Sequence, residues 1–118
     1  MNKTVLIADD SRFMRDLLKK HLKDSDFKVI AEASDGCEAV SLYRDVYPDL
    51  VIMDLNMPCK NGMNALENIK NMDSNAKVVI CSAMGQQRIN IEALGQGAKD
   101  FVVKPYFNEL VPTLKKLV

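Results

Sequence analysis

Five short apolar segments, separated by stretches with helical periodicity, constrain the fold of this chain more than any other feature. They span residues 5–8, 27–33, 49–53, 77–81 and 101–103. The stretches between them repeat apolar residues every three or four positions, as on one face of a helix. These connections are too long for hairpins, so the strands are predicted to lie parallel with right-handed crossovers. The sequence therefore predicts an α/β fold with a five-stranded parallel sheet, doubly wound by helices on both faces.

The predicted helices are bounded by residues typical of helix ends. Ser11 is expected to cap the first helix, whose apolar positions are Phe13, Leu17, Leu18 and Leu22. The others are expected between residues 36 and 48, over about 64–71, over about 86–94 and at the C-terminus, with Leu66 and Ile69 pointing inward in the third. Pro112 lacks an N–H, which a helix tolerates in its first turn. The last helix is therefore predicted to start late or irregularly.

Length and charge exclude several classes of function. The 118 residues are predicted to form one domain, residues 1–118, and the formal net charge of +0 argues against broad binding to nucleic acid or membrane. No apolar run approaches the ~20 residues that a membrane span needs. The N-terminus also lacks the features of a signal peptide, so a cytoplasmic location is expected.

The three cysteines are Cys37, Cys59 and Cys81. Their number is odd, they form no C-x-x-C pair, and the chain has one histidine, so a structural zinc site is not expected. We expect three reduced thiols, of which Cys59, in a predicted loop, is the most reactive.

Polar residues of chemical interest follow four of the five predicted strands. They are Asp9 and Asp10, Asp54, Ser82 and Lys104. Because the carboxyl ends of parallel strands share one edge of the sheet, these side chains should converge there. Crowded carboxylates repel one another, and Mg²⁺ relieves that repulsion while leaving room for a phosphate. An ammonium and a hydroxyl beside the metal would suit an anion.

This arrangement predicts a nucleophilic role for Asp54, which could attack a phosphoryl group to form an aspartyl phosphate. Lys104 and the metal would neutralise charge on the phosphoryl oxygens. Each residue alone has a simpler explanation, because an Asp at a strand end is usually a turn former or helix cap. It is the placement of all of them on one edge that favours a functional site.

The chain resembles response-regulator receiver domains of the CheY type. The matching motifs are Asp9-Asp10, Met53-Asp54-Leu55-Asn56-Met57-Pro58 with Gly62, Cys81-Ser82-Ala83, Gly97-Ala98-Lys99-Asp100-Phe101 and Lys104-Pro105. They occur in the family's order and spacing and cover nearly the whole chain. The stretch from Cys81 to Gln87 is similar to stand-alone chemotaxis regulators outside the enteric bacteria.

The resemblance implies a role for each residue of the metal and phosphoryl site. Asp54 would be the phosphoacceptor and would bind Mg²⁺ together with Asp10 and the carbonyl group of Asn56. Asp9 would act on the metal largely through water. Lys104 would pair with the phosphoryl group, and the peptide bond that follows it, to Pro105, would be cis.

The resemblance also implies a switch. Ser82 would move to bond a phosphoryl oxygen, and Phe101 would change rotamer, altering the face made by the fourth helix, fifth strand and fifth helix. Phe101 departs from the tyrosine usual in the family, so no phenolic hydroxyl can report the state. A histidine kinase or phosphotransfer protein would be the donor, and a flagellar motor switch protein is a candidate target.

The basic residues of the first predicted helix have two interpretations. They are Arg12, Arg15, Lys19, Lys20 and Lys23. They are expected to form a solvated face, with contact to an acidic surface on a kinase or phosphotransfer protein as the alternative.

The sequence thus predicts a two-component phosphorylation switch and not a turnover enzyme. The alternatives are a phosphorelay intermediate or phosphate sink, and a receiver fragment of a longer response regulator. A haloacid-dehalogenase-type phosphatase needs a second Asp two residues after the nucleophile, where this chain has Asn56. A flavin-binding module on the same fold would need a hydroxyl-rich phosphate loop after the first strand, which the sequence lacks.

Overall fold

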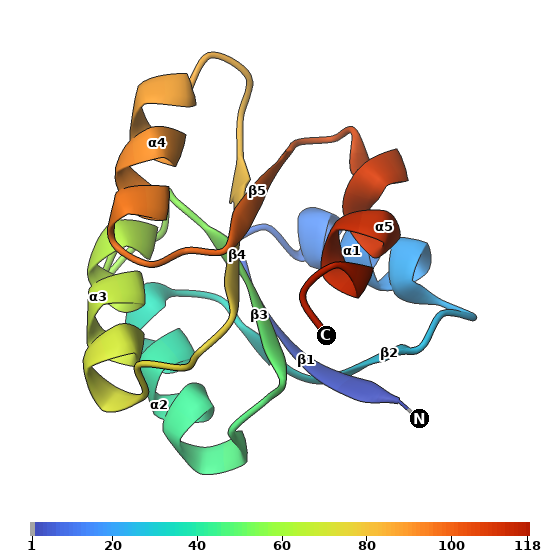
Figure 1. The fold of residues 1–118 in the computed structure, drawn as a ribbon, viewed down its shortest axis with the longest axis horizontal. Coiled ribbons are helices and arrows are strands. Elements are labelled where there is room, and N and C mark those ends of the chain that lie inside the picture. Colours follow the sequence, from blue (N-terminus) through green and yellow to red (C-terminus); the bar gives the residue numbers. More distant parts are fainter. Residues whose placement is uncertain (1) are drawn as a thin grey trace.

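The central sheet contains the five predicted strands, all parallel, in the order β2-β1-β3-β4-β5 (Figure 1). The computed structural model describes residues 2–118. The strands are β1 (Lys3–Ala8), β2 (Phe27–Ala33), β3 (Leu50–Asp54), β4 (Val78–Ser82) and β5 (Asp100–Val103). Every residue of β3 and β4 is buried, which explains their continuously apolar sequences.

Helices cover both faces of this sheet, so the predicted doubly wound fold is confirmed (Figure 1). The helices are α1 (Arg12–Leu22), α2 (Gly36–Val46), α3 (Gly62–Met72), α4 (Gln87–Gly95) and α5 (Leu110–Lys115), with the 3₁₀ helix η1 (Phe107–Glu109) before α5. Helices α2, α3 and α4 pack on one face, and α1 and α5 on the other. Leu66 and Ile69 of α3 are fully buried, as predicted.

Three polar N-caps set where the first three helices begin. Ser11 accepts a hydrogen bond from the N–H of Met14 at 3.3 Å, which confirms its predicted capping role. Asp35 caps α2 and Asn61 caps α3 in the same way. These caps satisfy backbone donors that a helix start otherwise leaves unpaired, and they place all three helix starts just after the carboxyl ends of strands.

The last helix starts late, as Pro112 predicted. The chain first makes η1, and α5 then begins at Leu110. Pro112 is therefore in the first turn of α5, where its missing N–H costs the helix no backbone hydrogen bond.

The predicted burial of Phe13 is wrong. Leu18 and Leu22 of α1 are buried, but the Phe13 side chain is 70% exposed. Helical spacing places Phe13 close to the apolar stripe, but the rotation of α1 on the sheet leaves it on the solvent side. Among the described residues, no helix is long and apolar enough to cross a membrane.

The expectation of three reduced thiols is also wrong. Cys37, in the first turn of α2, and Cys59, in the loop between β3 and α3, are joined by a disulfide, and Cys81 is free and buried. The two cysteines are 22 positions apart in the sequence. Only the parallel sheet brings the start of α2 beside the loop after β3, so their spacing alone gave no signal.

Candidate functional site

The polar residues that follow the strands do converge at one edge of the sheet, as predicted. Strand register pairs Ala8 with Met53, Asp54 with Cys81 and Ser82 with Val103. The residues at or just after these positions therefore lie side by side. They are Asp9, Asp10, Asp54, Ser82 and Lys104.

Three carboxylates form an acidic cluster at this edge. Asp9 and Asp54 are 1% and 4% exposed, whereas Asp10 is exposed to solvent. One carboxylate oxygen from each lies within 4.8 Å of the others. Carboxylate oxygens at this spacing are the donors that a hard divalent cation prefers, so the cluster is compatible with Mg²⁺.

Lys104 lies between the two buried carboxylates. Its Nζ is 2.9 Å from Oδ1 of Asp54 and 3.0 Å from Oδ2 of Asp9. Burial raises the pKa of Asp54, and the Asp9 charge raises it further, while the hydrogen bond from Lys104 opposes both. Burial acts to lower the pKa of Lys104, but its bonds to Asp54 and Asp9 outweigh it and raise that pKa. The Lys104 ammonium is thus shared by two carboxylates, which leaves negative charge that a further cation could neutralise.

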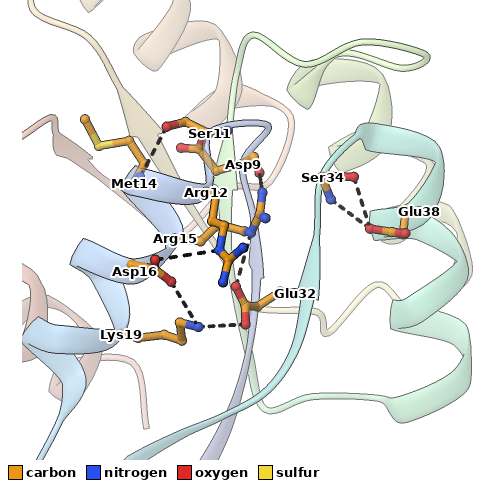
Figure 2. A network of polar contacts seen from close by, with 10 residues as sticks. All are labelled: Asp9, Ser11, Arg12, Met14, Arg15, Asp16, Lys19, Glu32, Ser34 and Glu38. Atoms are coloured by element: carbon orange, nitrogen blue, oxygen red, sulfur yellow. Dashed lines mark hydrogen bonds and ion pairs between the residues drawn. The ribbon is translucent and has the colours of Figure 1, made fainter.

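Helix α1 holds Asp9 in place (Figure 2). The Ser11 N–H donates to Oδ1 of Asp9 at 2.9 Å, and Arg15 Nη1 donates to the Asp9 carbonyl oxygen at 2.7 Å. Arg15 Nε and Lys19 Nζ in turn contact the Glu32 carboxylate at 3.1 and 2.9 Å. Arg15 is therefore a supporting residue that the sequence did not single out. Its basic neighbours at helical spacing favoured a solvated face, and only the packing of α1 beside β2 distinguishes it from them.

Ser82 ends β4 with its hydroxyl directed into the interior. Its Oγ is fully buried and has no hydrogen-bond partner among residues 2–118. A buried hydroxyl without a partner is costly, and an anion at the site would supply one. This unpaired donor and the acidic cluster together fit a metal ion with a bound phosphoryl group.

Phe101 lines a cavity together with Ala83, the residue that follows Ser82. The cavity has a volume of about 250 Å³, and Met84, Asn90 and Phe101 are among the residues that line it. Phe101 is partly buried and packs against the core beneath α4. The side chain therefore has space into which a rotamer change could move it.

Two further expectations concern the loops at this edge. The peptide bond between Lys104 and Pro105 is cis, as the family resemblance implied. Asn56 is exposed two residues after Asp54, and its backbone N–H acts to lower the pKa of Asp54. The metal-binding role of its carbonyl group stays a prediction.

Comparison with known proteins gives one consistent result. Residues 5–115 match the response regulator receiver domain. The chain is 52% identical over 102 residues to the chemotaxis protein CheY of Listeria monocytogenes, which covers 86% of each protein. It is 50% identical over 106 residues to CheY of Thermotoga maritima, covering 90% of this chain and 88% of that protein.

A solved structure agrees with this result. The CheX–CheY–BeF3–Mg complex of Borrelia burgdorferi contains a chain that superposes with a TM-score of 0.92 at 36% identity, covering 98% of this chain and 88% of that one. Sequence, fold and site geometry thus agree. The chain belongs to the response regulator receiver domain family and is homologous to the CheY regulators of chemotaxis.

Proposed function

We propose that the chain is a chemotaxis switch that is phosphorylated on Asp54 in a Mg²⁺-dependent reaction. The observation that carries the proposal is the position of Lys104, whose ammonium lies between the buried carboxylates of Asp54 and Asp9. A simple buried ion pair would need one carboxylate beside Lys104, but here one oxygen from each of three carboxylates lies within 4.8 Å of the others. The excess of negative charge supports a site for a divalent cation next to a group that accepts phosphate.

Asp10, Asp54 and the Asn56 carbonyl would hold the Mg²⁺, with Asp9 acting through water. When bound, the ion would neutralise charge on the phosphoryl oxygens. The carboxylates of this site suit Mg²⁺, because this ion binds a few carboxylate oxygens and keeps its other coordination positions for water and phosphate.

The side chains of this site have separate tasks in the transfer. A carboxylate oxygen of Asp54 attacks phosphorus, an O–P bond forms, and the bond from phosphorus to the donor's leaving group breaks. Lys104 shifts from the Asp54 oxygen to a phosphoryl oxygen, which needs little movement because its Nζ is 2.9 Å from the acceptor. Ser82 then donates its unpaired hydroxyl to another phosphoryl oxygen.

The movement of Ser82 would be read out on the face of α4, β5 and α5. Phe101 would move toward the cavity that Met84 and Asn90 help to line. Ile91 of α4 and Tyr106 after β5 are 68% and 62% exposed, so this face offers apolar side chains to a target. A target with apolar residues would gain or lose affinity as this surface rearranges.

The partners follow from the same chemistry. The donor would be a cytoplasmic histidine kinase, a phosphotransfer protein or a small acyl phosphate, and the target a flagellar motor component. Homology to CheY and the similarity to a chain of a CheX–CheY complex support partners of the signalling class. Output by binding, without turnover of a substrate, is part of the proposal.

Labelling with acetyl phosphate tests the phosphoacceptor. The wild type should gain one phosphoryl group in Mg²⁺ and none in excess chelator, and Asp54→Asn should gain none. Asp26→Asn, which changes an exposed carboxylate far from the site, serves as the control and should label normally. Label on Asp54→Asn would contradict the site, and turnover of phosphate esters well above stoichiometry would favour a phosphatase.

Target capture tests the output. The immobilised protein with Mg²⁺ and beryllofluoride, a phosphoryl mimic, should retain a motor component that the untreated form and Asp54→Asn do not. Capture of kinases or phosphotransfer proteins alone, regardless of activation, would instead favour a phosphorelay intermediate.

A further inference from the structure

The disulfide between Cys37 and Cys59 lies next to the proposed site but has no task in the transfer described above. It joins the first turn of α2 to the loop between β3 and α3, with Cα atoms 6.0 Å apart. Cys59 is three residues after Asn56 and five after Asp54. The bond therefore tethers the loop whose Asn56 carbonyl is proposed to bind the metal.

The non-covalent contacts at this point are close as well. The Gly36 N–H donates to the Pro58 carbonyl oxygen at 3.4 Å. A Cβ at Gly36 would lie 1.7 Å from the Lys60 carbonyl oxygen, so the start of α2 touches the loop backbone directly. Displacement of residues 58–60 would thus move the loop relative to α2, and the disulfide limits that displacement.

Cys59 also has an unusual backbone conformation. Its φ of 66° lies in the left-handed region, which a residue with a Cβ adopts at a cost. Such a conformation persists when the surroundings hold it in place. Cleavage of the bond to Cys37 removes one of these restraints, so the loop around Cys59 gains freedom.

The exposure of the three cysteines separates this pair from the third. Cys59 is exposed and Cys37 is half-buried, so a thiol in solution can reach the disulfide. Cys81 is buried, and burial raises its pKa to about 12, so its thiolate is scarce at neutral pH. In the cytoplasm, where the proposed function places the chain, disulfides are rare and are usually transient, catalytic or redox-sensing.

We propose that Cys37 and Cys59 form a redox-controlled pair that sets the affinity of the Asp54 site for Mg²⁺ and the phosphoryl group. The disulfide form holds the loop ready for the metal, and the dithiol form releases it. This inference rests on the proposed function, because it concerns regulation of the same site.

The exchange needs a reductant of the dithiol class. A thiolate of the reductant attacks Sγ of Cys59, the S–S bond breaks, and Cys37 leaves as a thiolate that takes a proton. The second thiol of the reductant then attacks the mixed disulfide and releases Cys59, which is protonated in turn. Two electrons pass to the protein, and the reductant leaves as a disulfide. A low-molecular-weight disulfide reverses the reaction.

A loop held in its binding conformation avoids an ordering cost when the ligand binds. The disulfide form should therefore bind Mg²⁺ more tightly, and reduction should weaken binding about fivefold, at the lower end of typical coupling between two sites. Reduction should weaken Mg²⁺ binding more when beryllofluoride is present, because the phosphoryl mimic needs both the metal ligands and the phosphoryl-binding residues in place.

The test uses the full chain in two redox states, prepared with oxidised glutathione and with dithiothreitol. Alkylation after unfolding, read by mass spectrometry, should find one free thiol in the first state and three in the second. Calorimetry then gives the Mg²⁺ affinity of each state. The double variant Cys37→Ser, Cys59→Ser should bind like the reduced wild type and should not respond to dithiothreitol. The reduced wild type provides the same comparison if that variant does not fold.

Each outcome distinguishes the two proposals. A disulfide that forms, with tighter Mg²⁺ binding lost on reduction, supports the inference. Three free thiols after exposure to oxidised glutathione, or equal affinity in both states, would overturn it and leave the proposed function standing. Failure of both states to bind Mg²⁺ and beryllofluoride would overturn the proposed function and the inference together.

Discussion

The Lys104 ammonium lies 2.9 Å from Oδ1 of Asp54, at the end of the central strand β3. The same ammonium also serves Asp9, 3.0 Å away, and both carboxylates are almost fully buried. One positive charge for two buried negative charges leaves an uncompensated anion in the metal-free protein. Burial of an unpaired charge is costly, so this site is built for ligand binding at the expense of stability.

Replacing Asp54 should therefore stabilise the metal-free protein. Asp54→Asn leaves Asp9 and Lys104 as a balanced pair, and we expect the free energy of unfolding to rise by about 1 kcal/mol. Urea denaturation in chelator measures the change. Asp26→Asn, at an exposed position, should stay within about 0.5 kcal/mol of the wild type. A loss of stability in Asp54→Asn would show that Lys104 needs both carboxylates.

Acid should weaken the binding of Mg²⁺ by competition at Asp54. Because burial raises the pKa of this carboxyl, it takes up a proton at a higher pH than an ordinary Asp, and the metal must displace it. The Mg²⁺ affinity should thus fall as the pH drops toward that raised pKa, with proton release on binding detected by calorimetry in two buffers. A Mg²⁺ affinity that stays constant as the pH falls from neutral would contradict the raised pKa of Asp54.

Acid should weaken Mg²⁺ binding, but at Asp54 it should raise the stability of the metal-free protein. Between the ordinary pKa of 3.8 and the raised value, the folded state binds more protons at Asp54 than the unfolded state. Stability rises with pH only where the unfolded state binds more protons, so the contribution of Asp54 increases as the pH falls. The difference in unfolding free energy between Asp54→Asn and the wild type should accordingly shrink in acid.

The sequence predicted the strands and the site for one physical reason. A parallel strand covered on both faces is continuously apolar, and the polar residue that ends it lies at the common edge. This logic correctly placed Asp9, Asp54, Ser82 and Lys104 together. It could not predict the rotation of a helix about its axis, which separates exposed Phe13 from its buried neighbours on α1.

Contacts between distant segments were also beyond the sequence. Arg15 and Lys19 are both basic residues on α1, yet only Arg15 reaches the Asp9 carbonyl oxygen. The Cys37–Cys59 bond likewise depends on how the start of α2 meets the loop after β3. Such pairs are determined by tertiary packing, which neither periodicity nor residue type encodes locally.

Loss of the Arg15 side chain should reach the site through Asp9. Arg15→Met removes a charge-assisted hydrogen bond to the Asp9 carbonyl oxygen and a partner of Glu32, so we expect a loss of about 1.5 kcal/mol in unfolding free energy and weaker Mg²⁺ binding. The matched control is Arg12→Met, because Arg12 is 86% exposed and its only recorded pairing among the described residues is with Asp16 at 3.9 Å. Equal effects of the two substitutions would show that Arg15 acts only as a surface charge.

Tyr43 should stabilise the packing of α2 against α3 through its hydroxyl. This side chain is 2% exposed, and its hydroxyl donates to Oδ2 of Asp73 at 2.8 Å. Tyr43→Phe should lower the unfolding free energy by about 1 kcal/mol at neutral pH. Tyr47→Phe, at a position 56% exposed, should have almost no effect. Urea denaturation of both variants checks the difference.

The contribution of Tyr43 should disappear in alkali. Burial and then the bond to Asp73 raise its pKa above the ordinary 10.0. The folded state therefore keeps the proton longer than the unfolded state, and the stabilisation is complete below pH 10 and declines as the pH rises through the raised pKa. The gap between wild type and Tyr43→Phe should narrow above pH 10, and a gap that widens there would contradict this assignment.

Gly36 and Gly95 offer a matched pair for the contact between α2 and the loop after β3. A Cβ at Gly36 would lie 1.7 Å from the Lys60 carbonyl oxygen, whereas a Cβ at Gly95, in the last turn of α4, would meet nothing within 4 Å. Gly36→Ala must therefore displace backbone, and we expect it to cost about 2–3 kcal/mol. Gly95→Ala should instead stabilise by about 0.5 kcal/mol, because alanine restricts the unfolded chain more than glycine does.

Thermal unfolding distinguishes these two variants, and Mg²⁺ calorimetry adds a second measurement. Because the loop that Gly36 contacts also carries Asn56, Gly36→Ala should weaken Mg²⁺ binding, while Gly95→Ala should leave it unchanged. A Gly36→Ala protein that loses stability but binds Mg²⁺ normally would show that the loop can move without disturbing the metal ligands. That result would also remove the structural basis for control of the site by the neighbouring disulfide.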